Sequence, residues 1–272
     1  NRLALIGSSI AFFSPIPVID ATFGAGAELA DRLSRGEAVV LNVRTDTELV
    51  PVPTSNVIAV SRVGRDDRRV VVGGHLDSVP AGPGINNNGS GTAAILEVAL
   101  QMARLEIEPL NRMVFAFWGA EERGLLGSAH YVDQLSDNER DRVLANLNFD
   151  MIGSPNHGNF IYDGDGSATE NAPVGPPGSA EIEQVFIDAF ERMGLPHDPT
   201  PFSGRSDYGP FIQVGIPAGG LFTGAEQPKS AAMAERYGGE ADIPFDPCYH
   251  RSCDTIENVN WRALDAMGDA VA

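Results

Sequence analysis

The sequence predicts an α/β protein, built as an α/β sandwich around a mostly parallel β-sheet. Two observations predict this class. Strand-like segments alternate with helix-like segments along most of the 272 residues. Two of the strand-like segments, "RMVFAFWGA" and "ANLNFDMIG", are continuous apolar runs, which is typical of strands buried on both faces of a parallel sheet.

The most apolar stretch is residues 3–19. Pro15 and Pro17 interrupt it, and it is shorter than the ~20 residues that a membrane span needs. We therefore interpret it as two buried strands, and we expect no membrane association.

Ahead of residue 51, we expect a strand at 16–21, a helix at 26–36 and a strand at 38–45. The helix has two leucines one turn apart and a closing glycine. Residues 1–50 should therefore form a small α/β segment.

Two strands follow at 56–63 and 68–77, separated by the polar turn "GRDD". The next segment, 90–105, has the pattern of a strong helix. It is apolar on most sides, so we expect it to be buried.

The rest of the chain continues the alternation. In order, we expect a strand at 112–120, a helix at 126–135, a strand at 145–153, a helix at 179–194 capped by Ser179, and a strand at 217–224. In sheets of this kind, functional sites form at the carboxyl ends of the strands.

Side chains able to bind metals follow these strand ends. They are His75 and Asp77, Glu121 and Glu122, Asp150, and, near the C-terminus, His250. Each has an ordinary alternative, because a lone histidine is usually structural, paired glutamates are usually solvated and an aspartate after a strand often caps a helix. Their convergence on one edge of one sheet indicates a zinc site.

Two details of this set add chemistry. Asp77 can orient His75 from behind as a supporting partner of a metal ligand. Glu121 and Glu122 are adjacent and point in different directions, so we expect one to bind metal and the other to act as a base.

The net charge of −18 argues against a nucleic-acid-binding protein, which needs a basic face. It fits a secreted or extracellular protein or one that holds cations, and equally a chain that is simply soluble. Cys248 and Cys253 are the two cysteines. Five residues apart, they could close a disulfide loop in an oxidising compartment. The competing interpretation, a zinc pair, offers His250 alone as a further ligand, and we favour the disulfide.

At this point the chain resembles the secreted zinc aminopeptidases of peptidase family M28, especially the bacterial Streptomyces type. The stretches that carry the resemblance are "GGHLDSVPAGPGIN", "NGSGTAAILE", "FAFWGAEERGLLGS", "LNFDMIGSPN", "GRSDYGPF", "GGLFTGAE" and "CYHRSCD". The resemblance implies the zinc exopeptidase fold, a three-layer α/β/α sandwich around a mixed, mostly parallel sheet. Residues 1–50 resemble, more weakly, the tail of a protease-associated (PA) domain. Residues 51–272 would be the peptidase domain, clipped at both ends.

The resemblance also implies roles for individual residues. His75 and Asp150 would hold one Zn²⁺ and Glu122 and His250 the other, and Glu121 would be the general base. Four further residues would serve the substrate: Tyr249 would donate a hydrogen bond to the oxyanion, Arg205 would bind near the substrate N-terminus, and Met151 and Phe222 would line an apolar pocket for the first side chain. The substrate would be a peptide with a free N-terminus and a large apolar first residue, and the enzyme would be a secreted monomer.

The loop "GPGINNNGSG" departs from the family pattern. The family places an aspartate that bridges both metals at position 87, and this chain has Asn87. An amide offers one good oxygen and an NH2 group that cannot bind a metal. We therefore expect weak binding of the second ion and reduced activity. Three interpretations of Asn87 stay open: a natural residue of a slow or one-metal enzyme, an engineered loss of a ligand, or the mark of a non-catalytic relative, against which the presence of the other catalytic positions argues.

Two alternative functions stay open. One is a catalytically dead module that binds peptides, and the other is a glutaminyl cyclase-like acyltransferase that uses one zinc ion. A structural Ca²⁺ is a further candidate cofactor, as in some relatives. The acidic residues that could hold it, Asp242, Asp246, Asp254 and Asp265, are too dispersed in the sequence to define a site.

Overall fold

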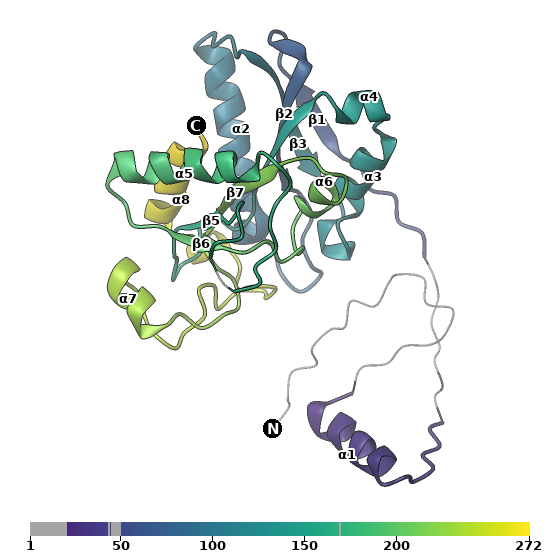
Figure 1. Cartoon of the computed structure of the whole chain (residues 1–272). Coiled ribbons are helices and arrows are strands. Elements are labelled where there is room, and N and C mark those ends of the chain that lie inside the picture. The colour runs from purple at the N-terminus through teal and green to yellow at the C-terminus, as the bar shows by residue number, and fades with distance from the viewer. Residues whose placement is uncertain (1–20, 43, 45–49, 169) are drawn as a thin grey trace. The chain divides into compact units, whose positions relative to one another are not determined.

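The computed structural model describes residues 21–42, 44, 50–168 and 170–272 (Figure 1). The chain divides into two compact units, residues 1–53 and 54–272, which are described separately. Within the described residues, no helix is both long enough and apolar enough to cross a membrane.

The first unit contains one described helix, α1 (Phe23–Ser34). It begins earlier than predicted because Thr22 caps it, with its hydroxyl accepting from the Ala25 N–H at 3.3 Å. The predicted strand at 38–45 is wrong for residues 38–42 and 44, which form no strand. A strand needs a neighbour for its N–H and C=O groups, and no described residue of this unit pairs with them. The strands predicted within 3–19 lie outside the described residues, as does most of 16–21.

The second unit is built on a seven-stranded sheet. The strands are β1 (Val57–Val60), β2 (Arg65–His75), β3 (Asn111–Trp118), β4 (Val143–Phe149), β5 (Phe160–Tyr162), β6 (Asp198–Thr200) and β7 (Ala218–Phe222). Their order is β1-β3-β2-β4-β7-β5-β6. The pairs β3–β2, β2–β4, β4–β7 and β5–β6 are parallel, and β1–β3 and β7–β5 are antiparallel. This confirms the predicted mixed, mostly parallel sheet.

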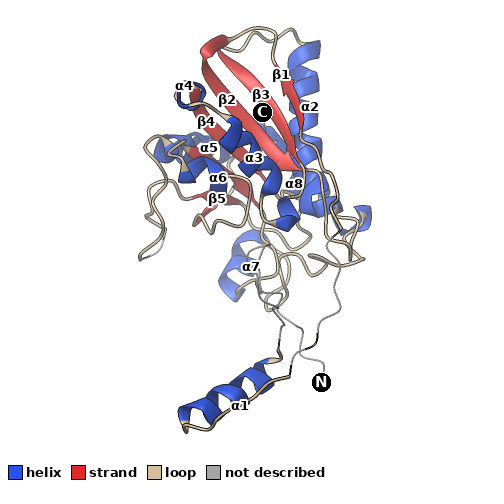
Figure 2. Ribbon diagram, turned by 90° about the vertical axis from the view of Figure 1, so that its right-hand side faces the viewer, coloured by secondary structure: helices blue, strands red, loops and turns tan. Residues whose placement is uncertain are grey.

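Helices cover both faces of this sheet, as Figures 1 and 2 show. On one face lie α2 (Gly91–Arg104), α5 (Ser179–Met193) and α8 (Trp261–Val271), and on the other lie α3 (Leu126–Gln134) and α6 (Gly209–Gln213). The short helices are α4 (Asp137–Arg140), α7 (Ala231–Tyr237), η1 (Ile85–Ser90), η2 (Glu121–Arg123) and η3 (Ile256–Asn258).

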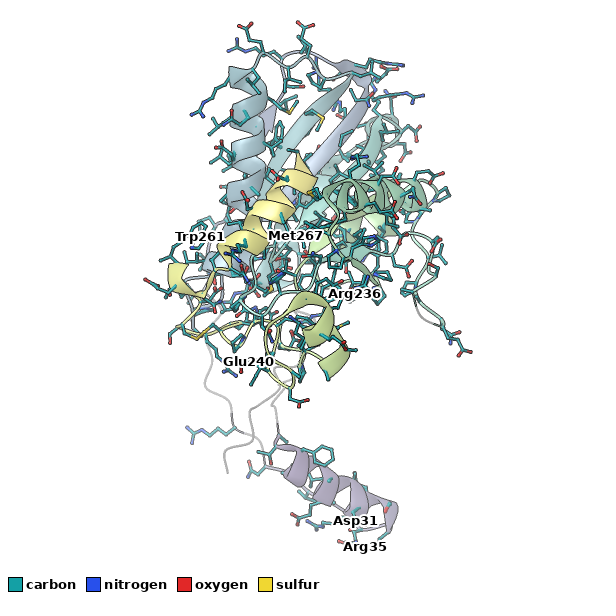
Figure 3. The ribbon with its side chains drawn as sticks, turned by 90° about the vertical axis from the view of Figure 1, so that its left-hand side faces the viewer. Asp31, Arg35, Arg236, Glu240, Trp261 and Met267 are labelled. Carbon is teal, nitrogen blue, oxygen red and sulfur yellow. A yellow bond between two sulfur atoms is a disulfide. The ribbon has the colours of Figure 1, made fainter. Side chains whose placement is uncertain are left out.

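Alternate side chains of β3 belong to two different core clusters, because successive residues of a strand point to opposite faces of the sheet. Phe115 and Phe117 pack with the α2, α5 and α8 side, where Met267 of α8 is fully buried (labelled in Figure 3). Val114 and Trp118 pack with α3 and α6 on the opposite side. The central strands are therefore buried on both faces, which confirms the three-layer α/β/α sandwich.

Two local expectations are corrected. Helix α2 is not buried all round, because Leu96 is 49% and Leu100 is 42% exposed on the face turned away from the sheet. The cap of α5 is Gly178 rather than Ser179. The Ser179 hydroxyl instead accepts from the Ala218 N–H of β7, which ties the start of α5 to the sheet.

Candidate metal centre

The parallel strands β2, β3 and β4 end at one edge of the sheet and deliver ionisable side chains there. His75 is the last residue of β2, Glu121 follows β3 in η2, and Asp150 comes directly after β4. All three are buried, and one ligand-type atom from each lies within 4.8 Å of the others. The predicted convergence of these strand ends is therefore present in the structure.

The site consists of two pairs with an amide between them. His75 Nε2 lies 3.4 Å from Asp150 Oδ1, and His250 Nε2 lies 2.9 Å from Glu122 Oε1. Asn87 connects the pairs, because its Oδ1 lies 3.1 Å from His75 Nε2 and its Nδ2 donates to Glu122 Oε1 at 2.8 Å.

The environment of His75 fits a cation. Its Nδ1 lies 3.0 Å from the Asp77 carbonyl oxygen, which can only accept, so Nδ1 carries the hydrogen. In the neutral ring, the Nε2 lone pair then faces oxygens of Asn87, Asp150 and, at 4.0 Å, Glu121. Burial alone would lower the pKa of His75, but these carboxylates raise it well above its usual value. A positive charge is favoured at Nε2, supplied either by a proton or by a metal ion.

Two further atoms support this interpretation. Asp150 Oδ1 and His250 Nε2 are buried, and although each lies close to its partner in the pair, neither makes a contact with hydrogen-bond geometry among the described residues. Buried polar atoms are normally paired, and both atoms belong to ligand types that zinc prefers. The two halves are nevertheless unequal. The Asn87 oxygen is directed to the His75–Asp150 pair, whereas its NH2 group, which cannot bind a metal, is directed to Glu122.

Asp77 supports the site in a different way from the one predicted. Its carboxylate stays 3.7 Å from His75 Nδ1, and its main-chain carbonyl orients the ring instead. The carboxylate accepts the main-chain N–H groups of Glu121 at 2.9 Å and Glu122 at 3.2 Å. Asp77 therefore fixes the turn that separates the two glutamates.

In the metal-free site, the Glu121 carboxyl binds a proton tightly. Burial raises the pKa of its carboxyl to about 9, and His75 partly opposes the shift. A cation bound beside it would lower this pKa again and leave the carboxylate ionised near neutral pH.

The loop that carries Asn87 is anchored by residues that the sequence did not single out for this purpose. The Asp254 carboxylate accepts the main-chain N–H groups of Asn86 at 2.9 Å and Asn87 at 3.1 Å. The loop also runs against the end of β4, because a Cβ atom at Gly91 would lie 2.2 Å from the Phe149 carbonyl oxygen. Asp254 was considered in the sequence for calcium alone.

Two neighbours in "GRSDYGPF" were also missed. The Ser206 hydroxyl donates to Asp150 Oδ2 at 2.7 Å and so orients that carboxylate. Asp207 is fully buried, and neither of its oxygens has a hydrogen-bond partner among the described residues. Burial raises the pKa of Asp207 to about 7. Serine and aspartate in a loop carry no signal that distinguishes them from turn residues.

The predicted substrate-binding residues lie around this centre. Arg205 donates to the Tyr249 hydroxyl at 3.2 Å and pairs with Glu226 at 2.8 Å. The Tyr249 ring stacks on His250, with ring centroids 3.8 Å apart. Burial raises the pKa of Tyr249 above its usual value, so the phenol keeps its proton at neutral pH.

The remaining predicted residues are also placed. Met151 is buried beside Asp150, and Phe222 ends β7 with its ring 6.2 Å from that of Phe160. Cys248 and Cys253 form a disulfide with their Cα atoms 5.3 Å apart, which excludes them as zinc ligands in this structure.

Of the four acidic residues considered for calcium, Asp246 and Asp254 are engaged in other contacts, whereas Asp242 and Asp265 are exposed. Asp246 and Asp254 accept hydrogen bonds from the Asn258 side chain and from the loop at Asn86. A second acidic group, not predicted, brings together Asp163, Asp165 and Glu183. The Asp163 oxygens already accept N–H groups of the following turn.

Comparison with known proteins matches this geometry. The model of peptidase family M28 covers residues 56–272. An aminopeptidase of Pseudomonas aeruginosa is 49% identical over 94% of this chain and 46% of its own length. Leucine aminopeptidase 2 of Arthroderma otae is 49% identical over 88% of this chain and 47% of its own length.

Solved structures agree on the fold. A zinc aminopeptidase from Bacillus subtilis superposes with a TM-score of 0.63 and 31% identity, over 79% of this chain and 48% of its own. A glutaminyl cyclase from an Acidobacteriales bacterium gives 0.58 at 20% identity, over 79% of this chain and 70% of its own, which shows a shared fold alone. The chain spans about half the length of the curated relatives it matches. Because the family model matches residues 56–272, nearly all of the second unit, the chain belongs to peptidase family M28.

Proposed function

We propose that this chain carries the catalytic centre of a zinc aminopeptidase that removes N-terminal residues from peptides. The observation that carries the proposal is the pair of half-sites, His75–Asp150 and Glu122–His250, with the buried carboxyl of Glu121 beside them. The names of the relatives support the same activity and the same metal.

The residues present fit zinc. His75 and Asp150 would hold one ion, with the Asn87 oxygen as a further ligand, and Glu122 and His250 would hold a second. Bound there, zinc supplies Lewis-acid polarisation of the scissile carbonyl and lowers the pKa of water to about 7.

The chain's own groups supply the other steps. Glu121 takes a proton from the attacking water and returns it to the departing amine, which is general acid–base catalysis by one carboxyl. The Tyr249 hydroxyl donates to the developing oxyanion, and Arg205 holds this phenol in place through their hydrogen bond. Arg205 is also placed to bind the substrate near its N-terminus.

Substrate preference follows from the apolar residues next to the centre. Met151 adjoins the ligand Asp150 in sequence, and Phe222 ends the strand beside β4. These two side chains would receive a large apolar first residue such as Leu, Met or Phe. The leucine aminopeptidase name of the Arthroderma relative supports this preference.

Asn87 weakens one half of the centre in this proposal. Its NH2 group donates to Glu122 Oε1, so it competes with a cation for that oxygen. A neutral amide would also supply no negative charge to offset the repulsion between cations held by the two half-sites. We therefore expect one tightly bound zinc ion and slow turnover.

Zinc content and turnover of matched variants test the proposal. The assay compares the chain with its Asn87→Asp variant after dialysis, by elemental analysis and by hydrolysis of leucine anilide. For the chain with Asn87, we expect about one zinc ion per chain and weak turnover that a chelator abolishes. For the Asn87→Asp variant, we expect about two zinc ions per chain and strong turnover. Asn138→Asp is the control, because it adds the same charge on the exposed helix α4.

Other outcomes separate the alternatives. Two zinc ions and full turnover in both proteins, with asparagine still present at 87 by mass spectrometry, would show that an amide suffices there. Zinc binding without any turnover in either protein would favour a peptide-binding module. Cyclisation of a peptide with an N-terminal Gln, without release of an amino acid, would favour a glutaminyl cyclase.

The predicted setting of the enzyme accompanies this proposal. The Cys248–Cys253 disulfide and the acidic composition support secretion, because such bonds persist in oxidising compartments. The PA identity of residues 1–50 and the monomeric state stay predictions.

A further inference from the structure

The three consecutive asparagines of η1 have different surroundings. Asn88 is bound to main chain throughout: its Nδ2 donates to the Phe149 carbonyl, and its Oδ1 accepts from the N–H groups of Gly91 and Met151. This side chain holds the loop against the ends of the strands, and within the described residues none of its hydrogen bonds goes to a side chain of the metal centre.

Asn86 is anchored in a similar manner. Its Oδ1 accepts from the Gly153 N–H at 3.1 Å, and its Nδ2 donates to Asp246 at 2.7 Å and to Ser154. These bonds require an oxygen on one side and an NH2 group on the other. An amide is therefore the fitting group at both 86 and 88, and a carboxylate would face acceptors there.

Asn87 is the exception, because its side chain contacts His75 and Glu122. The carbonyl oxygen lies 3.1 Å from His75 Nε2, where a bound cation would polarise the carbonyl. The amide nitrogen lies 2.8 Å from Glu122, and Glu121 approaches the same His75 nitrogen at 4.0 Å. A primary amide thus sits among the groups that the proposed function uses to break amide bonds.

We propose that the chain hydrolyses the side-chain amide of its own Asn87 and converts this residue to aspartate. The inference rests on the proposed function, because it applies the same chemistry to a resident amide. Asn87 is then a modification site, and its conversion supplies the carboxylate that the Glu122–His250 half of the centre lacks.

The reaction balances with water as the one co-reactant. Water adds to Cγ of Asn87 while Glu121 takes one of its protons. The Cγ–Nδ2 bond then breaks, and the nitrogen leaves as ammonia after receiving that proton. The new carboxyl group ionises and ammonia becomes ammonium, so no oxidant or reductant is involved.

This route differs from ordinary deamidation. In the ordinary route, the next main-chain nitrogen attacks Cγ, and the cyclic imide opens to a mixture of aspartate and isoaspartate. Asn-Gly sequences are the most prone to it, and here that sequence is Asn88-Gly89. Direct hydrolysis predicts change at 87 rather than at 88, and aspartate without isoaspartate.

Peptide mapping by mass spectrometry tests the inference without relying on peptidase activity. The chain is incubated at neutral pH with zinc or with a chelator, and the replacement of NH2 by OH is located along residues 85–90. Asn86 and Asn88 serve as internal controls. Glu121→Gln is the test variant, and Glu235→Gln, on the exposed face of α7, is its matched control.

The expected result is conversion of residue 87 alone to aspartate, faster with zinc than with chelator. Conversion should be at least about 100-fold slower in Glu121→Gln, because the base is lost. A freshly isolated chain that already has aspartate at 87, while Glu121→Gln retains asparagine, supports the inference equally. Zinc content and circular dichroism show whether Glu121→Gln is folded. Incubation of the unsubstituted chain with a chelator tests whether conversion depends on the metal centre.

Three results would overturn it: retention of asparagine at 87 in the folded, zinc-bound chain, equal conversion in both glutamine variants, or isoaspartate at 87. The proposed function is judged separately from turnover by Asn87→Asp. If the Asn87→Asp variant is active while the unaltered chain retains Asn87, self-hydrolysis is rejected and the proposed function stands. An inactive variant rejects the peptidase.

Discussion

The carboxylate of Asp254 offers a quantitative test of how the loop of the metal centre is held. It is 1% exposed and accepts three hydrogen bonds, from the main-chain N–H groups of Asn86 and Asn87 and from the Asn258 side chain. In an Asp254→Ala variant, the two main-chain groups would remain buried without their acceptor. A buried, unpaired donor costs about 1–3 kcal/mol, so we expect a loss of about 2–6 kcal/mol in the free energy of unfolding.

A loss of this size is a large fraction of the total, because domains are stable by about 5–15 kcal/mol. Urea unfolding of the zinc-free chain measures it, and the slope with denaturant should stay constant. Asp254→Asn keeps one acceptor oxygen, so its loss should be intermediate. Asp265→Ala on the exposed face of α8 is the control and should change stability by about 0.5 kcal/mol or less.

A loss of less than about 1 kcal/mol in Asp254→Ala, at an unchanged denaturant slope, would show that the two main-chain N–H groups are not left unpaired. Such a result would mean that water enters and replaces the carboxylate. Hydrogen exchange at residues 86 and 87 would distinguish unpaired N–H groups from N–H groups paired with water. If Asp254→Ala leaves the loop without its acceptor, the variant should lose protection from exchange at these two residues first.

Two further predictions concern ionisable groups of the centre. In the Asn87→Asp background, Glu121→Gln should keep its zinc but lower turnover of leucine anilide by about 10²–10⁴-fold, because it removes the base. The control Glu235→Gln should have no effect on turnover. An unchanged rate in Glu121→Gln would exclude Glu121 from proton transfer. Asp207 has a pKa raised from 3.8 to about 7 by burial, so the native state holds its proton more tightly than the unfolded state does. Stability of the zinc-free chain should therefore fall as pH rises across that window, by up to about 4 kcal/mol, and Asp207→Asn should remove this fall. Unfolding free energies measured from pH 4 to 8 would contradict the prediction if the difference between the two proteins were independent of pH.

The sequence predicted the parts of this structure that depend on period and strand direction. Apolar runs identified the central strands, and because parallel strands end at one edge, His75, Glu121 and Asp150 could be placed together before any coordinates were known. The disulfide followed from the spacing of two cysteines. These inferences rest on local pattern and on one rule of topology.

The parts that failed depend on tertiary partners. Residues 38–45 have the composition of a strand, but the described ones have no neighbour to pair with. Leu96 and Leu100 fit a buried helix by composition, yet one face of α2 is left uncovered. The bonds from Asp254 to the Asn87 loop span 167 residues, and no local pattern indicates such a partner.

That separation has a consequence for the order of events during synthesis. A nascent chain displays His75 and the Asn87 loop before residues 250–254 are made, and β2, β3 and β4 can pair by then. Neither His250 nor the acceptor that fixes the loop exists at that stage. The centre is therefore completed only after residues 250–254 have been translated, so a nascent chain can pair β2, β3 and β4 without a complete metal centre.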